Sequence, residues 1–291
     1  GDSGSWFNVD LENLSASALG YERMAVTPEK VGKISTITYQ AGDGLEIEAI
    51  LTLPPGKDPT NLPLVVFPHG GPTGQDDAVF DWWAQAVAYR GYAVLQPNFR
   101  GSTNRDRAFI RAGYGEWGRK MQTDLSDGIA HLAAEGIVDP SRACIMGASY
   151  GGYAALAGVT LQQGIYRCAV SFAGVSDLTR LTRTEIRESG SNSMVKRVLK
   201  EEIGQGRELK DISPRRFADR ADAPVLLIHG KDDVVVPFEQ SFIMADALKD
   251  AGKPYELISL EGEDHWLSRS ETRVETLRAA IKFLEEHNPP G

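Results

Sequence analysis

The apolar positions of this 291-residue chain follow two repeating patterns from residue 62 onward. Short, almost unbroken apolar runs are typical of strands buried on both faces. They occupy residues 64–67, 93–96, 143–146, 169–172, 225–228 and 256–259. Amphipathic stretches typical of helices lie between and after them, at residues 79–90, 124–135, 150–162, 238–251 and 270–286. This alternation predicts an α/β fold with a mostly parallel central sheet and helices on both faces.

Three segments depart from that rhythm. Residues 33–39 and 45–53 alternate apolar and polar positions around Gly42-Asp43-Gly44, which predicts a hairpin and an antiparallel start to the sheet. Residues 1–30 are loosely patterned, with one strand-like piece at 5–11, and are read as a linker at the edge of something upstream. Residues 177–220 carry many charges and no clear strand, so we expect an excursion over the active site.

The composition of the chain says little about its fold but excludes some classes of binding partner. The chain is 42% hydrophobic and 24% charged, as in an ordinary globular enzyme, and its formal net charge is −9. Nucleic acids and anionic membranes attract a basic surface, so neither is expected as a partner. No apolar stretch reaches the roughly 18 residues of a membrane span, and no signal peptide is visible. We therefore expect a cytoplasmic protein. Because the sequence begins at Gly1, a periplasmic or secreted location stays open. The sequence also leaves open whether the chain forms an oligomer.

The two cysteines, Cys144 and Cys168, each lie inside an apolar strand-like run. Such positions are typical of buried free thiols, and this is the interpretation we adopt. A disulfide between neighbouring strands is the alternative.

The segment around Ser149 has the pattern of a nucleophile elbow. Gly147-Ala148-Ser149-Tyr150-Gly151 follows an apolar strand-like run and precedes a helical stretch. A strand, a sharp turn and a helix in this order expose a serine Oγ to substrate, and the flanking glycines leave room for the turn. A serine that merely caps the helix is the alternative, but it does not account for the acid and base candidates downstream.

A serine hydroxyl needs a base, and the base needs an orienting acid. Two carboxylates, Asp232 and Asp233, follow a late strand, and the residues alone leave both open as the acid. The base candidate is His265, on the loop between the last strand and the last helix. The alternatives are weaker, because His131 and His287 fall in predicted helices and His229 is read as packing or loop support.

An oxyanion hole would complete this site. The turn Phe67-Pro68-His69-Gly70-Gly71-Pro72 follows an early strand and can offer a backbone N–H toward the serine. The second donor would be the N–H of the residue after the nucleophile, Tyr150. A plain Gly-Gly-Pro turn is the alternative for this segment alone.

Four stretches together resemble the catalytic domain of the prolyl oligopeptidase family of serine peptidases, in its acylaminoacyl peptidase and dipeptidyl peptidase branch. They are residues 69–72, 96–102, 147–153 and 229–237, and the resemblance covers roughly residues 33–287. It implies an α/β-hydrolase fold over residues 31–291, with Ser149, Asp233 and His265 as the triad. It also implies Gly71 and Tyr150 as backbone oxyanion donors. Family members carry a β-propeller upstream, of which residues 1–30 would be the remnant.

The function expected from these observations is hydrolysis of peptide bonds through an acyl-enzyme. The substrates would be oligopeptides, acylaminoacyl peptides or dipeptidyl substrates. A carboxylesterase or lipase with the same triad is the alternative, because the acyl chemistry is shared. A non-catalytic domain on the same fold is disfavoured by the intact Ser, Asp and His. No metal and no cofactor are expected. The side chains that would select the substrate, such as Phe99, Tyr114, Trp117 and Arg187, cannot be placed from sequence.

Overall fold

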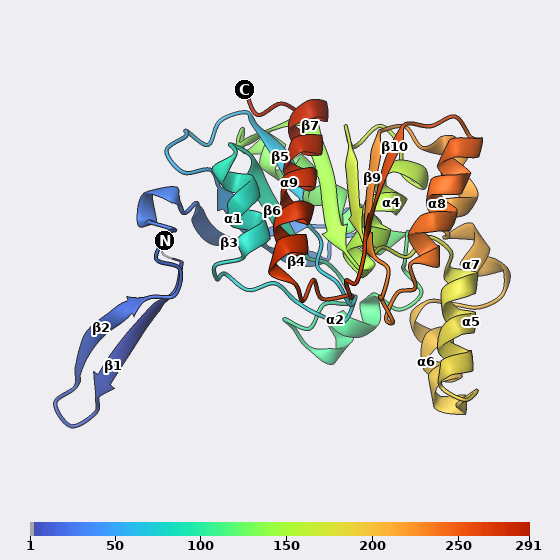
Figure 1. Ribbon diagram of the computed structural model, residues 1–291, viewed down its shortest axis with the longest axis horizontal. Helices are drawn as coiled ribbons and strands as arrows, with labels where there is room; N and C mark the ends of the chain where they lie inside the picture. Colours follow the sequence, from blue (N-terminus) through green and yellow to red (C-terminus); the bar gives the residue numbers. More distant parts are fainter. Residues whose placement is uncertain (1–2) are drawn as a thin grey trace.

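A computed structural model describes residues 3–291, and a single large sheet forms its centre (Figure 1). The strand order in this eight-stranded sheet is β10-β9-β8-β7-β5-β6-β4-β3. Neighbours from β10 to β6 are parallel, whereas β4 pairs antiparallel with both β6 and β3. The strands are β3 (Lys33–Gln40), β4 (Glu46–Leu53), β5 (Leu62–Val66), β6 (Ala93–Asn98), β7 (Val138–Ala148), β8 (Ala169–Phe172), β9 (Val225–Gly230) and β10 (Tyr255–Leu260). The predicted sheet and its antiparallel hairpin are confirmed.

Helices cover the sheet on both sides, α1 and α9 on one face and α3, α4 and α8 on the other (Figure 1). The helices are α1 (Trp82–Tyr89), α2 (Arg107–Ala112), α3 (Lys120–Ala134), α4 (Tyr150–Thr160), α5 (Leu178–Glu188), α6 (Ser193–Glu202), α7 (Arg207–Asp211), α8 (Glu239–Asp250) and α9 (Ser270–His287), with short 3₁₀ turns η1 (Pro28–Lys30) and η2 (Pro214–Arg220). The predicted α/β-hydrolase architecture is thus confirmed.

The unbroken apolar runs reflect two separate cores. Successive side chains of a strand point to opposite faces of the sheet. Along β5, Leu64 and Val66 pack into the core under α3 and α4, while Val65 between them packs into the core under α1 and α9. All three are fully buried. A strand with helices on both sides can hold apolar residues at every position, and this is why no alternation is visible in the sequence.

The expectation of two free thiols is wrong. Cys144 on β7 and Cys168, just before β8, form a disulfide with a Cα–Cα distance of 4.9 Å. The two strands are parallel neighbours in which Ile145 lies opposite Ala169, so the residues before them also face each other. Both sulfurs point into the core under α1 and α9. The separation is within the range that a disulfide spans, and it depends on the register of β7 and β8, which the sequence does not reveal.

Residues 177–220 contain α5, α6, α7 and η2 and no strand, in line with their charge-rich pattern. This segment packs beside the sheet next to α8 (Figure 1). It reaches the loop between α2 and α3, where Gly115 N–H donates to the Glu202 carbonyl, at 2.9 Å. In the part of the chain that the structure describes, no helix is long and apolar enough to cross a membrane.

The N-terminal residues form a hairpin that projects from the rest of the molecule (Figure 1). Its strands β1 (Ser5–Asp10) and β2 (Ser15–Tyr21) pair with each other in a two-stranded sheet. The sequence indicated the first strand but not the second. Large apolar side chains are exposed on it and just after it, namely Trp6, Phe7, Val9, Leu11, Leu14, Leu19, Tyr21 and Met24.

Candidate active site

The candidate residues come together because all of them follow the carboxyl ends of parallel strands. The His69 turn follows β5, Ser149 follows β7, Asp233 follows β9 and His265 follows β10. Parallel strands end at one edge of a sheet, where such folds bind their ligands. These four loops are therefore brought to one place, although they are far apart in sequence.

Ser149 sits on a strained turn between β7 and α4. Its φ of 58° and ψ of −118° are a conformation that non-glycine residues adopt rarely, and only where the surrounding structure enforces it. Packing supplies that constraint here. A Cβ on Gly147 would lie 2.5 Å from the Gly151 carbonyl carbon, and one on Gly151 would lie 2.1 Å from the Pro68 oxygen. Ser149 stands at the N-cap position of α4 but makes no side-chain capping bond, so helix capping does not explain it.

Asp233 faces His265, whereas its neighbour Asp232 is exposed to solvent. The Asp233 Oδ2 accepts a hydrogen bond from His265 Nδ1 at 2.6 Å. Its Oδ1 accepts the backbone N–H groups of Val235 and Val236, at 2.9 and 2.8 Å. Burial raises the pKa of Asp233, but hydrogen bonds from His229, His265 and Val236 outweigh it and hold the pKa well below its usual value. The carboxyl group is therefore ionised at neutral pH.

This contact decides the proton position on His265. A carboxylate only accepts, so Nδ1 carries the proton and Nε2 of the neutral ring is free to accept another. His265 and Ser149 line the same cavity, of about 290 Å³. Catalysis would need a hydrogen bond from Ser149 Oγ to His265 Nε2. Among the hydrogen bonds of the described residues, none joins these two atoms. Apo sites often hold such pairs at longer range.

The glycine-rich turn after β5 lies directly against the nucleophile. A Cβ on Gly70 would be 3.5 Å from Ser149 Cβ, so the backbone approaches the serine closely. At Gly71 the φ is 125°, and a Cβ there would be 2.6 Å from Thr73 N. Tyr150 is the first residue of α4, where a backbone N–H has no partner within the helix. Tyr150 thus adjoins Ser149 in the chain, and Gly70 brings the turn that contains Gly71 against the serine.

His69 fastens this turn to the loop after β6. Its ring stacks on Phe99 with a centroid distance of 4.4 Å. Its Nε2 lies 2.8 Å from Ser102 Oγ, and its Nδ1 lies 2.8 Å from the Gly70 carbonyl oxygen. Burial lowers the pKa of His69 to about 4, so the ring is neutral at neutral pH. It therefore binds its neighbours through hydrogen bonds and stacking and without a net charge.

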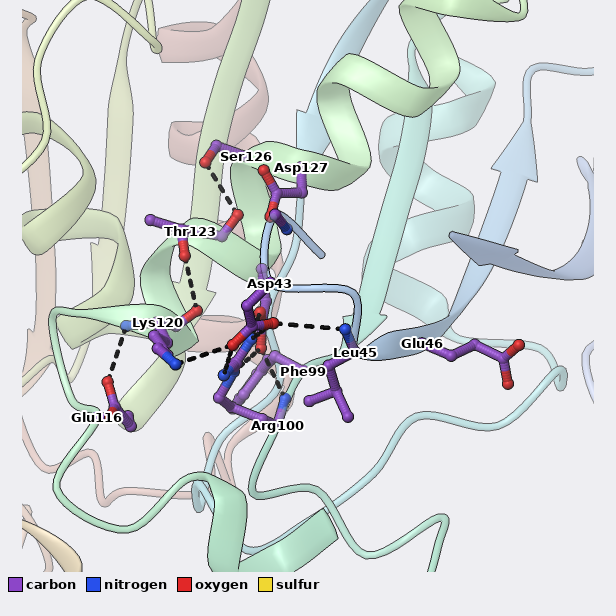
Figure 2. A network of polar contacts seen from close by, with 12 residues as sticks. Asp43, Leu45, Glu46, Phe99, Arg100, Glu116, Lys120, Thr123, Ser126 and Asp127 are labelled. Atoms are coloured by element: carbon purple, nitrogen blue, oxygen red, sulfur yellow. Dashed lines mark hydrogen bonds and ion pairs between the residues drawn. The ribbon is translucent and has the colours of Figure 1, made fainter. Parts of the chain in front are cut away.

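A partly buried ionic network in turn holds the loop after β6 (Figure 2). The guanidinium of Arg100 donates to both oxygens of Asp124, at 2.8 and 2.7 Å, and to both oxygens of Asp43, each at 2.9 Å. Lys120 adds a contact of 2.9 Å to Asp43. Hydrogen bonds from Arg100 and Lys120 hold the pKa of Asp43 well below its usual value. The network ties α3 and the turn between β3 and β4 to the residue next to Phe99.

Two groups of residues at the site had no clear signal in the sequence. His229 is fully buried, with Nε2 at 3.2 Å from Asp233 Oδ2 and 2.8 Å from the Val236 carbonyl, so it supports the acid more directly than expected. The other group is aromatic and belongs to the cavity at Ser149. That cavity is lined by Gly70, Trp82, Trp83, Ala148, Ser149, Phe172, His265, Trp266 and Leu267. It includes none of residues 177–220, which were expected to cover it.

The aromatic residues that were expected to select the substrate, Phe99, Tyr114 and Trp117, do not line the cavity at Ser149. Phe99 is buried under His69, and Trp117 packs edge-on against Tyr150 at a centroid distance of 4.6 Å. Tyr114 is partly exposed beside Trp117, at a narrow crevice. Among the described residues, no group of three or more His, Cys, Asp or Glu side chains is arranged to hold a metal ion.

The comparison with protein families agrees with this geometry. Residues 78–289 match the model of the prolyl oligopeptidase family. The chain belongs to the prolyl oligopeptidase family. The resemblance carried by the four sequence motifs is thereby confirmed.

Known members of the prolyl oligopeptidase family extend this match. Dipeptidyl aminopeptidase BIII of Pseudoxanthomonas mexicana is 34% identical over 239 residues, which cover 79% of this chain and 35% of that protein. The human acylamino-acid-releasing enzyme is 29% identical over 255 residues, covering 84% and 34%. The structure of a Mycobacterium tuberculosis puromycin-hydrolysing peptidase superposes with a TM-score of 0.87 at 31% identity, covering 98% of this chain and 44% of that one. The present chain thus spans about a third of the length of these two curated relatives.

Proposed function

We propose that this chain is the catalytic part of a serine peptidase, with Ser149 as nucleophile, His265 as base and Asp233 as the orienting acid. The observation that carries the proposal is the 2.6 Å bond from His265 Nδ1 to Asp233, which leaves Nε2 free at the cavity that Ser149 also lines. The strained turn at Ser149 supports it, because a conformation that costs free energy is kept where it positions a reacting group.

In the proposed reaction, Ser149 Oγ attacks the carbonyl carbon of the scissile bond while His265 Nε2 takes the hydroxyl proton. The backbone N–H groups of Gly71 and Tyr150 hold the negative charge that develops on the carbonyl oxygen. His265 then gives its proton to the leaving nitrogen, and the C–N bond breaks to leave an acyl-enzyme. Water, deprotonated by the same imidazole, attacks this ester and releases Ser149.

The substrates we propose are peptides or acylated peptides. Support comes from the relatives, whose names describe a dipeptidyl aminopeptidase, an acylamino-acid-releasing enzyme and a puromycin-hydrolysing peptidase. These names favour amide substrates over the oxygen esters of the carboxylesterase or lipase alternative. One test compares kcat/KM for an aminoacyl anilide with kcat/KM for the matching short ester, which separates a peptidase from an esterase. Repeating it with blocked and free-amine forms of each separates acylated substrates from those with a free N-terminus.

The direct test is Ser149→Ala. The variant should lose nearly all turnover and all labelling by a fluorophosphonate, because no other described hydroxyl lines the cavity beside His265. Peptide mapping of the labelled wild-type chain should place the label on Ser149. A label at any other residue, or turnover by the folded Ser149→Ala variant at the wild-type rate, would contradict the assignment.

We further propose that residues 1–30 are the remnant of an upstream β-propeller and that residues 31–291 form the catalytic domain. The projecting β1–β2 hairpin supports this, because its strands form a two-stranded sheet apart from the central sheet, and the hairpin exposes apolar side chains such as Trp6, Leu11 and Leu14. A longer form of the protein should bury these side chains. Protection of Trp6 from oxidative footprinting in the longer form, but not in the 291-residue chain, tests the proposal.

The compartment also stays a prediction. The cytoplasm was expected from the sequence, whereas the Cys144–Cys168 disulfide is a bond more typical of oxidising compartments. Alkylating free thiols in denaturant at the moment the native cells are lysed decides between them, because both cysteines are fully buried in the folded chain. Alkylation of both cysteines would support the cytoplasm, and resistance of both to alkylation would support the periplasm or secretion.

A further inference from the structure

We propose that the aromatic cavity beside Ser149 is a subsite for the leaving-group side of the scissile bond, and that it takes a large apolar or aromatic side chain. The inference rests on the proposed peptidase function and adds to it a preference for one class of leaving residue. The residues that would set the preference are Trp82 and Trp266.

The size of the cavity suits one side chain. Its volume of about 290 Å³ lies just below the range of roughly 300–1,000 Å³ that pockets for whole small-molecule ligands occupy. One large side chain fits such a space, whereas a folded or extended peptide does not. The cavity opens directly at Ser149, so a group bound in it is next to the bond that the serine attacks.

The position of His265 assigns the cavity to the leaving group. In acyl transfer by a serine, the same imidazole that deprotonates the serine must protonate the departing nitrogen. The departing half of the substrate therefore lies on the imidazole side of the nucleophile. His265, Trp266 and Leu267 are consecutive residues of the cavity wall, so the cavity is on that side.

The lining determines the class of side chain. Trp82 and Trp83 lie with ring centroids 4.6 Å apart, and Trp83 in turn contacts Phe172 at 6.0 Å. Of the nine described lining residues, none is Asp, Glu, Lys or Arg, and His265 is the one with an ionisable side chain. A charged leaving residue would lose hydration there without gaining a partner. An aromatic or large aliphatic one would gain contact with the rings.

Trp266 is a large apolar side chain that stays mostly exposed to solvent. Its side chain is 76% exposed, although it packs edge-on against the His265 ring with a centroid distance of 5.3 Å. A large apolar side chain contributes little to folding when it is this exposed. Trp266 follows the proposed base, His265, and lines the same cavity as Trp82, so it can contribute to binding instead.

Acyl transfer to added amines tests this side of the site separately from the acyl side. The 291-residue chain is acylated with one ester substrate, and phenylalanine amide and alanine amide then compete at equal concentration for the acyl group. We expect phenylalanine amide to react about tenfold faster, a ratio within the range of aromatic contact energies. Trp82→Ala and Trp266→Ala should each bring the ratio close to one, because each removes one ring of the wall.

Phe242→Ala is the matched control, since Phe242 is an aromatic residue of α8, 50% exposed, that does not line the cavity. It should keep the wild-type ratio. A wild-type ratio near one, or an unchanged ratio in both Trp variants, overturns the subsite. Because Trp266 is on the surface, its variant is expected to fold, which circular dichroism checks. If the wild-type chain forms no acyl-enzyme and takes no fluorophosphonate label, the peptidase proposal itself fails, which is a different result.

Discussion

Replacing Asp233 by Asn tests the proposed triad through the hydrogen bonds of both carboxylate oxygens. Oδ1 accepts the backbone N–H groups of Val235 and Val236, and Oδ2 accepts the Nδ1–H of His265. The asparagine amide has one acceptor and one donor end and can be placed in two ways. Directing the NH₂ at the two backbone donors would leave both unpaired, at a cost of about 1–3 kcal/mol each.

The amide oxygen of the introduced asparagine is therefore expected at the Oδ1 position, with its NH₂ group directed at His265. The ring can keep a hydrogen bond there only if Nδ1 becomes the acceptor, which moves the proton to Nε2. A protonated Nε2 cannot take the proton of Ser149. For a triad with the wrong tautomer the loss in kcat is about 10⁴-fold, or about 5.5 kcal/mol of transition-state stabilisation.

The assay is kcat/KM for an aminoacyl anilide, together with the rate of fluorophosphonate labelling, for Asp233→Asn and for Asp232→Asn. Asp232 is the exposed neighbour, so its variant carries the same chemical change outside the site and should stay within twofold of wild type. Circular dichroism checks that both variants fold. A folded Asp233→Asn variant within tenfold of wild type, or an equal loss in Asp232→Asn, would refute the proposed role.

Two further predictions concern stability. Gly151→Ala would place a Cβ 2.1 Å from the Pro68 carbonyl oxygen, so we expect a loss of several kcal/mol in the free energy of unfolding, measured by urea titration. Gly42→Ala, whose Cβ would meet its nearest atom at 3.7 Å, is the control and should change stability little. Burial, with Asp81 and Asp77 nearby, raises the pKa of Asp76 to about 7. The folded state then binds the Asp76 proton more tightly than the unfolded state does. The contribution of this group to the free energy of unfolding is therefore fully present below about pH 4 and is lost as the pH rises to 7. Asp76→Asn should therefore raise the melting temperature by a few degrees at pH 8 and hardly at all at pH 4. An equal effect at both pH values in scanning calorimetry would show that Asp76 is not the titrating group.

Much of the fold could be predicted because local patterns report it directly. The run at 64–67 became β5 and the run at 225–228 became β9, since strands buried on both faces admit apolar residues throughout. The alternation at 33–39 and 45–53 became the pair of β3 and β4. The second strand of the N-terminal hairpin was missed, because β2 (Ser15–Tyr21) exposes nearly all its residues and shows no buried face.

The sequence also placed the elements of the candidate site at the ends of their strands. Gly147 and Gly151 flank Ser149 and are visible in the sequence as a pattern, although a Cβ on Gly147 would collide with the tight turn and one on Gly151 with the Pro68 carbonyl oxygen of another segment. The order of the strands then implies that the loops after β5, β7, β9 and β10 meet at one edge. Chain order and local sterics were therefore enough to propose the nucleophile, the base and the oxyanion turn.

Other features depend on how distant segments are positioned, and the tertiary structure alone decided them. The disulfide between Cys144 and Cys168 depends on the register of β7 against β8, which sets whether two side chains face each other. The meeting of Trp82 and Trp266 in one cavity depends on how α1 and the loop after β10 approach across the sheet. Local sequence constrains the backbone of its own segment, but a contact between segments depends on packing along the whole chain in between. For this protein, the sequence by itself determined the fold class and the candidate nucleophile, and the packing decided what surrounds that nucleophile.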